Sequence, residues 1–82
     1  AGTSARAVFA GKVVSIVHIT TTNIAVIVKH GNYFSVYSGL DKVFVKVNSR
    51  VDRLQNIGKI HTSLQGKTEL HFELWKGKQL QN

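Results

Sequence analysis

The chain has 82 residues, a net charge of +7 and no cysteine. This length supports one domain, and the lack of cysteine excludes disulfides, cysteine-type zinc sites and thiol nucleophiles. No apolar run of about 18 residues is present, so we expect no membrane-spanning helix, and the first residues do not resemble a signal peptide. The excess of Lys and Arg favours anionic partners such as nucleic acid or envelope polymers, or simply a solvated basic surface.

The dominant hydrophobic period along the chain is two, which is typical of β-strands, because successive strand side chains point to opposite faces. We predict strands at residues 5–10, 12–20, 23–29, 33–38, 44–47, 58–61 and 68–76. A turn is expected at residues 39–42, and residues 54–57 are expected to form a short helical turn. No segment of ten or more residues keeps a helical period. The prediction is therefore an all-β fold, a small antiparallel sheet of sandwich or barrel-like shape.

One partial motif invites a functional interpretation that the rest of the chain does not support. Gly66, Lys67 and Thr68 resemble the end of a phosphate-binding loop. The complete motif requires a glycine five residues before Gly66, where this chain has His61. Nucleophile-elbow and H-E-x-x-H motifs are also absent from the sequence. We therefore expect neither nucleotide binding nor these classes of catalysis.

The last predicted strand carries the most distinctive pattern. Glu69, His71 and Glu73 alternate with apolar residues, so they are expected on one face of the strand, about 6.5–7 Å apart. Two of these side chains could reach one metal ion or clasp one cationic group. The simpler interpretation is a solvated strand face, with the alternating apolar residues in the core.

Four stretches of the chain match the motifs of one family in the family's order. They are G-T-S-A-R-A-V and A-G-K-V-V in residues 2–14, V-I-V-K-H-G and Y-S-G-L in residues 26–40, V-K-V-N-S-R-V and Q-N-I-G in residues 45–58, and E-L-H-F-E in residues 69–73. The family that they resemble is the LytM/lysostaphin-type zinc endopeptidases, which cut peptidoglycan cross-bridges. The resemblance covers nearly the whole chain and implies a single degenerate LytM-type domain over residues 1–82, lacking the family's N-terminal part.

The resemblance also implies which catalytic residues are lost. The family binds zinc with the His and Asp of an upstream H-x-x-x-D, which would precede this sequence, and with the second His of H-L-H, here His71. Glu69 replaces one assisting histidine and Gly39 replaces the other. Because one positioned acid–base group contributes about 10²–10⁴-fold to a rate, we expect no catalytic residues and no bound cofactor. A zinc site rebuilt with His30, His61 or Glu69 is the alternative.

Degenerate family members with the same losses, the EnvC-like proteins, act as murein hydrolase activators at the division site. The resemblance implies that this chain binds and activates a cell-wall amidase or another murein hydrolase in the periplasm or cell envelope, with peptidoglycan as a further partner. The expected binding groove is formed by the polar faces of two neighbouring strands. Its predicted residues are Tyr33, Ser35, Tyr37, Gly39, Glu69, His71, Glu73 and Trp75.

Two other functions stay open at this point. The first is an active zinc-dependent peptidoglycan endopeptidase with an altered site. The second is a nucleic-acid-binding β-barrel, because proteins that bind single strands pair basic grooves with stacking aromatic residues. Glu69 and Glu73 argue against the second, since their carboxylates would repel phosphates. A lipoyl- or biotinyl-type carrier is a weaker interpretation, because no lysine is clearly displayed at a hairpin tip.

Overall fold

A computed structural model describes residues 3–81, which form one curled antiparallel sheet without a helix. Its strands are β1 (Thr3–Arg6), β2 (Gly11–Thr20), β3 (Asn23–His30), β4 (Tyr33–Val43), β5 (Arg50–Val51), β6 (Asn56–Ile60), β7 (His71–Lys76) and β8 (Gln79–Leu80). The predicted all-β, barrel-like fold is therefore confirmed. Over this range, no helix has the length and apolar character needed to span a membrane.

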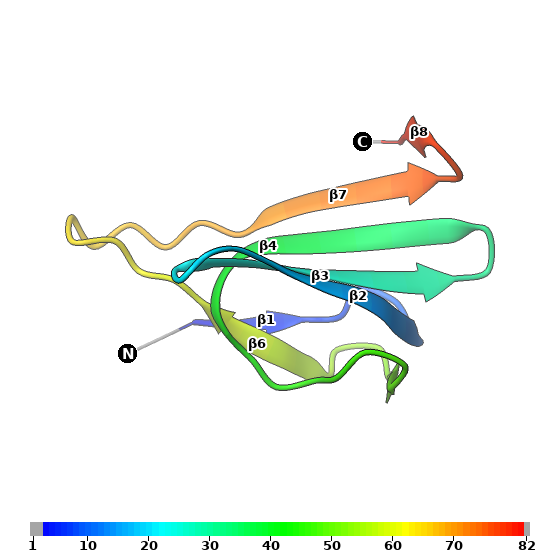
Figure 1. Cartoon of the computed structure of the whole chain (residues 1–82), viewed down its shortest axis with the longest axis horizontal. Helices are drawn as coiled ribbons and strands as arrows, with labels where there is room; N and C mark the ends of the chain where they lie inside the picture. The colour runs from blue at the N-terminus through cyan, green and yellow to red at the C-terminus, as the bar shows by residue number, and fades with distance from the viewer. Residues whose placement is uncertain (1–2, 82) are drawn as a thin grey trace.

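Strand β4 is the centre of the sheet, whose order is β1-β6-β4-β3-β2-β5 with β7 as a branch. One edge of β4 pairs with β3, while its other edge pairs first with β7 and then with β6. Figure 1 shows β4 curving from β7 toward β6. The turn expected at residues 39–42 is wrong, because Gly39, with φ of 88°, and a register shift after Leu40 bend β4 without ending it.

Two other local predictions fail for reasons of tertiary packing. Residues 44–47 alternate like a strand but form none, because Phe44 and Val47 are exposed and only Val45 packs against the core. The helical turn predicted at residues 54–57 is also wrong, since Leu54 has a positive φ of 67° and β6 begins at Asn56. The last long strand starts at His71 rather than at residue 68.

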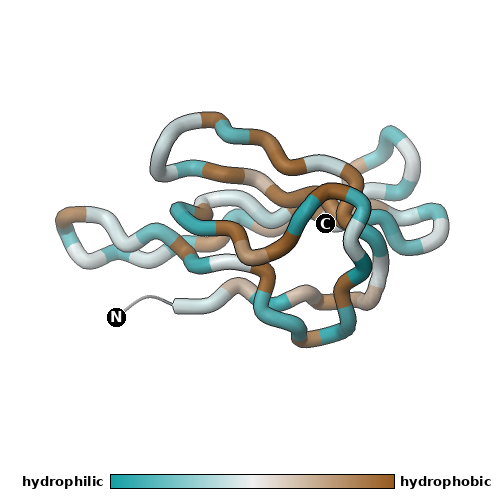
Figure 2. Tube along the Cα trace, turned by 60° about the horizontal axis from the view of Figure 1, so that its bottom comes forward, coloured by the Kyte–Doolittle hydropathy of each residue, from teal (hydrophilic) through white to brown (hydrophobic). Residues whose placement is uncertain are grey.

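The hydrophobic core lies on one face of the curled sheet and collects side chains from most of the strands. Its largest fully buried members are Tyr37, Leu40, Ile57, Val13, Val26, Val28 and Val51. Figure 2 shows that the hydrophobic stretches of the chain fall mostly in the strands and the hydrophilic ones in the connections. Buried polar groups need partners, and the backbone N–H of Val8 donates a hydrogen bond of 2.9 Å to the Tyr37 hydroxyl.

This hydrogen bond gives a first prediction. Tyr37→Phe keeps the ring in the core but leaves the partly buried Val8 amide without its acceptor, which should lower the free energy of unfolding by about 1 kcal/mol. The matched control is Tyr33→Phe, which removes the hydroxyl of an exposed tyrosine and should change stability by less than about 0.5 kcal/mol. Urea denaturation followed by tryptophan fluorescence measures both. Equal stabilities for the two variants would contradict this role of the Tyr37 hydroxyl.

Candidate functional site

The register between β4 and β7 decides which side chains share a face. On one face the opposed pairs are Phe34 with Trp75, Val36 with Glu73, and Ser38 with His71. On the other face they are Tyr33 with Lys76, Ser35 with Leu74, and Tyr37 with Phe72. The second face is the core side, because Tyr37 belongs to the core cluster and Phe72 packs against it.

This register corrects part of the predicted groove. Ser35 and Tyr37 are fully buried, so they cannot line a groove on the same face as His71 and Trp75. Their polar groups are satisfied inside the protein, where the Ser35 hydroxyl lies 3.1 Å from Nε2 of His30. Tyr33 is exposed but sits on the same side of β4 as Ser35. Tyr33 and Tyr37 therefore do not form one exposed stacking surface, because Tyr37 is buried in the core.

The open face of the sheet carries an apolar hollow of about 460 Å³ between β2, β3, β4 and β7. The residues that line it are Val14, Ile27, Phe34, Val36, Glu73, Trp75 and Gly77. Phe34 and Trp75 lie opposite each other on neighbouring strands, and both are half-buried. Sequence reasoning found Trp75 but missed Phe34 and Val36, because it assigned them to the core.

Three side chains of β7 form a hydrogen-bonded row along this face. The Glu73 carboxylate lies 2.8 Å from Nε2 of His71 and accepts a bond of 2.9 Å from the Trp75 indole N–H. The bonds from His71 and then from Trp75 stabilise the charged carboxylate and so lower the pKa of Glu73. His71, the histidine that matches the family's third ligand, therefore uses one ring nitrogen to hold Glu73.

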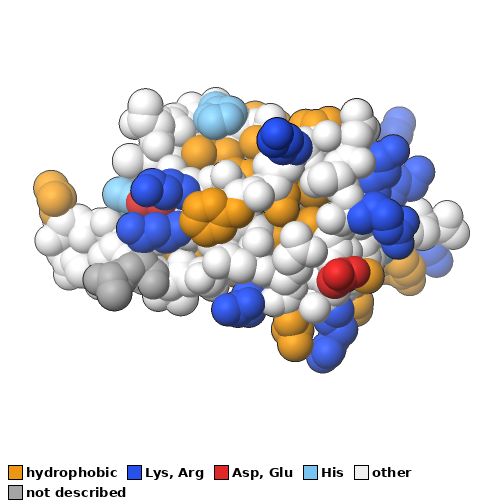
Figure 3. All heavy atoms as spheres, turned by 90° about the horizontal axis from the view of Figure 1, so that it is seen from below, with side chains coloured by type: hydrophobic (Ala, Val, Ile, Leu, Met, Phe, Trp, Pro, Cys, Tyr) orange, Lys and Arg blue, Asp and Glu red, His pale blue; other side chains and the backbone are white. Residues whose placement is uncertain are grey.

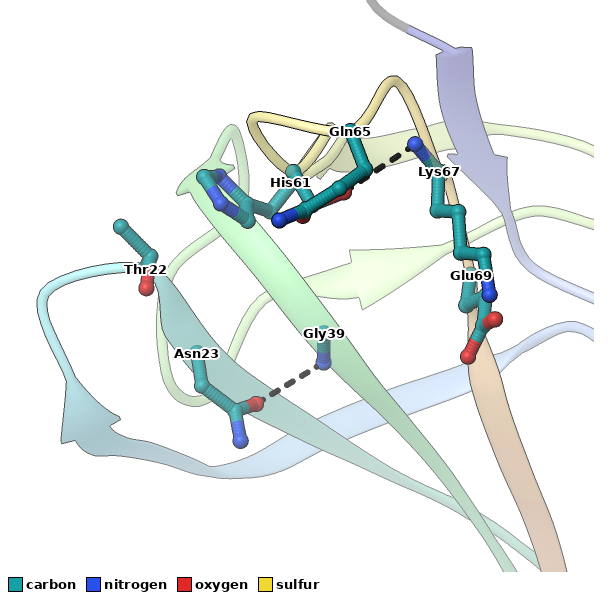
Figure 4. A pocket seen from close by; sticks show the side chains of 8 residues that line it. Thr22, Asn23, Gly39, His61, Gln65, Lys67 and Glu69 are labelled. Carbon is teal, nitrogen blue, oxygen red and sulfur yellow. Dashed lines mark hydrogen bonds between the residues drawn. The ribbon is translucent and has the colours of Figure 1, made fainter.

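A second, polar hollow of about 400 Å³ lies at the end of the groove where β4 bends. It brings together Gly39, Glu69 and His61, with Thr22, Asn23, Ser63, Gln65 and Lys67 as the remaining lining residues (Figure 4). Nδ1 of His61 lies 3.3 Å from the Asp41 carboxylate, and the Gly39 N–H donates to the Asn23 side chain at 2.9 Å. Sequence reasoning missed Asn23, whose place in a hairpin turn carried no functional signal.

Gly39 leaves no room for a side chain. Its φ of 88° is a backbone conformation that favours glycine. A Cβ atom at this position would lie 2.7 Å from the carbonyl oxygen of Glu69, which belongs to the backbone and cannot rotate away. The position that matches a histidine of the family is thus closed by the path of the chain itself.

Comparison with known proteins identifies the family. A family model described as peptidase family M23 matches residues 1–82, the whole sequence. The chain belongs to peptidase family M23. Among curated proteins, no sequence matches this M23 chain.

Three solved structures of the same fold belong to longer chains, of which this M23 chain covers between 50% and 67%. A chain of the crystal structure of the SpoIIIAH and SpoIIQ complex is similar with a TM-score of 0.85 and 26% identity, covering 100% of this chain and 60% of that one. The catalytic domain of a mutant of the prophage-encoded M23 protein EnpA from Enterococcus faecalis gives 0.81 and 24%, covering 99% and 67%. Cbpa from L. salivarius REN gives 0.76 and 22%, covering 95% of this chain and 50% of that one. At their identities, the last two show the fold alone.

The described residues of this M23 domain do not fit a catalytic zinc by themselves. Such a metal takes three protein ligands, and residues 3–81 contain no group of three His, Cys, Asp or Glu side chains placed to hold one. His61 is directed to Asp41 and His71 to Glu73, while Gly39 has no side chain. His30, the other candidate for a rebuilt site, bonds to buried Ser35 on the core side.

The tight approach at Gly39 gives a second prediction. Gly39→His should destabilise the domain clearly more than Gly66→His, because both glycines have a positive φ but only Gly39 has a backbone atom in the way. The unfavourable φ alone costs about 1–3 kcal/mol, so Gly66→His is the matched control for that contribution. Thermal and urea denaturation measure the difference. A Gly39→His variant as stable as the control would refute the steric closure of this site.

The row along β7 gives a third prediction, measured by NMR titration of the Glu73 carboxyl carbon. His71→Ala should raise the Glu73 pKa more than Trp75→Phe does, because His71 is the larger cause of its lowering. A carboxylate with a lowered folded pKa contributes stability above the unfolded pKa, and this contribution is lost as the pH falls through the folded pKa. His18→Ala, which removes a histidine from β2 instead, should leave the Glu73 titration unchanged. A titration that no variant moves would disprove the row.

Proposed function

We propose that this M23 domain is catalytically inactive and that it binds and activates a murein hydrolase, such as a cell-wall amidase, through its degenerate groove. The observation that carries the proposal is the closed site at Gly39, where neither a histidine nor any other side chain fits. The place of action would be the periplasm or another part of the cell envelope, with peptidoglycan as a further partner. We also propose that residues 1–82 form one M23-type domain.

The loss of acid–base groups supports the absence of catalysis. Glu69 stands where the family has its second assisting histidine, and a carboxylate does not reproduce the proton-transfer properties of an imidazole near neutral pH. Glu69 is exposed and lines the polar hollow beside Gly39. Gly39 and Glu69 therefore replace both residues that would move protons in a working M23 site. The losses in rate expected from the two replacements multiply.

The composition of the groove supports binding of a protein partner. Half-buried Phe34 and Trp75 flank an apolar hollow, and aromatic side chains of this kind dominate the energy of protein interfaces. The Trp75 N–H is already bonded to Glu73, so the row on β7 is held in place before a partner arrives. The similarity to a chain of the SpoIIIAH and SpoIIQ complex adds support, because that structure is of a protein–protein complex.

An altered zinc endopeptidase is the second candidate, and the polar hollow is the observation that favours it. His61 and Glu69 line this hollow together, and both are residue types that bind zinc. Further ligands would have to come from outside residues 3–81, since no third ligand lies with them in the described part of the chain. Zinc content therefore separates the two functions.

The test uses a purified murein amidase and dye-labelled peptidoglycan. The unmodified chain should increase dye release by the amidase, whereas the triple variant Phe34→Ala, Glu69→Ala, Trp75→Ala should lose at least about tenfold of this stimulation, because interface anchors are removed. Tyr37, part of the predicted groove, is left intact because it is a core residue. The matched control is Phe44→Ala, Val47→Ala, Asp52→Ala, which changes two exposed apolar residues and one exposed acid elsewhere.

Two results would contradict the proposal. The first is equal stimulation by the groove variant and by the control. The second is stoichiometric zinc, measured by plasma mass spectrometry, together with dye release by the chain without any amidase. That second result would establish the endopeptidase instead.

A further inference from the structure

The outer edge of β2 is unpaired over most of its length. β3 pairs with the inner edge of β2 from Lys12 to Thr20. On the outer edge β5 pairs only with Gly11 and Lys12, and the backbone of Val13 bonds to the turn before β5. From residue 14 to residue 20, no strand of the described chain pairs with this outer edge. A row of backbone donors and acceptors is therefore open to another chain.

This edge lacks two of the features that usually protect sheet edges, namely charged residues and proline. Natural edge strands carry charges, proline or strong bulges against unwanted pairing. Residues 13–28 contain no Lys, Arg, Asp, Glu or Pro, although the whole chain has a net charge of +7. The exposed side chains on β2 include Val14, Val17 and Ile19, with exposed fractions of 37%, 43% and 56%. Its pairing with β3 shifts register twice, between Val13 and Ser15 and between His18 and Thr20, and continues after each shift.

The charge around this edge is one-sided. Exposed Lys12, Lys46 and Arg50 lie where β5 and its preceding turn meet β2, at one end of the open edge. Of the four acidic residues, Asp52 is the one that directly follows β5. The others are Asp41 in β4, Glu73 in β7 and Glu69 shortly before β7. Figure 3 shows the same imbalance over one whole face, where Lys and Arg side chains far outnumber acidic ones. An incoming strand would therefore gain most from acidic residues at this basic end.

We propose that residues 14–20 of β2 accept an extended strand of a partner protein, which carries acidic residues where it meets Lys12, Lys46 and Arg50. This inference rests on the proposed function, because it specifies how a protein partner binds. In strand addition, main-chain hydrogen bonds supply affinity and alternate side chains supply specificity. Val14 also lines the apolar hollow, so one partner can cover the edge and the groove together.

A second copy of this chain fits the edge less well. Pairing two seven-residue edges, each about 23 Å long, buries less surface than the roughly 800 Å² per copy of a standard stable interface. It would also bring together two chains that each carry a net charge of +7. An acidic partner protein has the opposite charge, and it can bury additional surface in the apolar hollow beside the edge.

The probe is a ten-residue synthetic peptide in which valine and threonine alternate over seven positions and three glutamates complete the chain. Binding of this peptide should slow amide hydrogen exchange within residues 14–20. Calorimetry at low salt should detect the same binding. A twin peptide with three lysines should bind at least about tenfold more weakly, since opposite charges are replaced by like charges. A second twin, N-methylated at alternate amides, should not bind, because it cannot form the ladder of hydrogen bonds.

Protein variants test the same edge from the other side. Val17→Glu with Ile19→Glu should weaken binding of the glutamate peptide at least about tenfold, because charges on an edge oppose pairing and like charges repel the peptide. The matched control adds the same charge at two other exposed apolar positions, Phe44→Glu with Leu64→Glu, and should bind as the unmodified chain does. The peptide twins keep the test decisive even where a variant folds poorly.

Four outcomes would overturn the inference. They are equal binding of the two charged peptides, binding of the N-methylated peptide, exchange protection outside residues 14–20, and a concentration-dependent dimer of the chain that Val17→Glu with Ile19→Glu removes. The amidase assay separates this inference from the proposed function. Full stimulation by the edge variant overturns strand addition alone. Peptide binding at the edge by a chain that stimulates no amidase supports strand addition and refutes the activator function.

Discussion

The alignment of β4 against β7 is the constraint on which the rest of the site depends. Because strand side chains alternate between faces, a shift of β7 by one residue would exchange the core side and the open side of β7. The observed register places Tyr37 and Phe72 in contact in the core, with ring centroids 5.3 Å apart. The same register leaves Phe34 and Trp75 on the open face. Core and groove are thus two consequences of one pairing.

The bend of β4 links the shape of the sheet to the proposed loss of catalysis. β4 pairs with β7 before Gly39 and with β6 after it, so the strand must change direction at this point. Glycine allows the positive φ and the close approach of the Glu69 carbonyl that this path requires. In this chain the residue that bends the strand stands where a working M23 site has an assisting histidine. In the proposed inactive domain, the geometric requirement of the backbone at Gly39 and the absence of a proton-transfer group are one feature.

The remaining surface carries the features on which the proposed binding of another protein rests. Glu73 and His71 are engaged with each other, and the hollow beside them is apolar. The polar hollow at Gly39 contains both acidic and basic side chains but, in the residues described, no set of metal ligands. An open, uncharged strand edge adjoins the apolar hollow at Val14. The proposed recognition, through apolar burial and backbone pairing, would use the apolar hollow and the open edge together.

The sequence by itself determined the β-strand content and the family, because period-two alternation and four ordered motifs are local signals that need no knowledge of contacts. It also pointed to Gly39 and Glu69 as replaced positions. Only the tertiary structure decided which face of residues 33–38 is buried. Tyr37 and Ser35 resemble a polar surface in sequence, but their partners, the Val8 amide and the His30 ring, come from other strands or loops. Satisfaction of a buried hydroxyl depends on contacts across the sheet, and no local pattern encodes them.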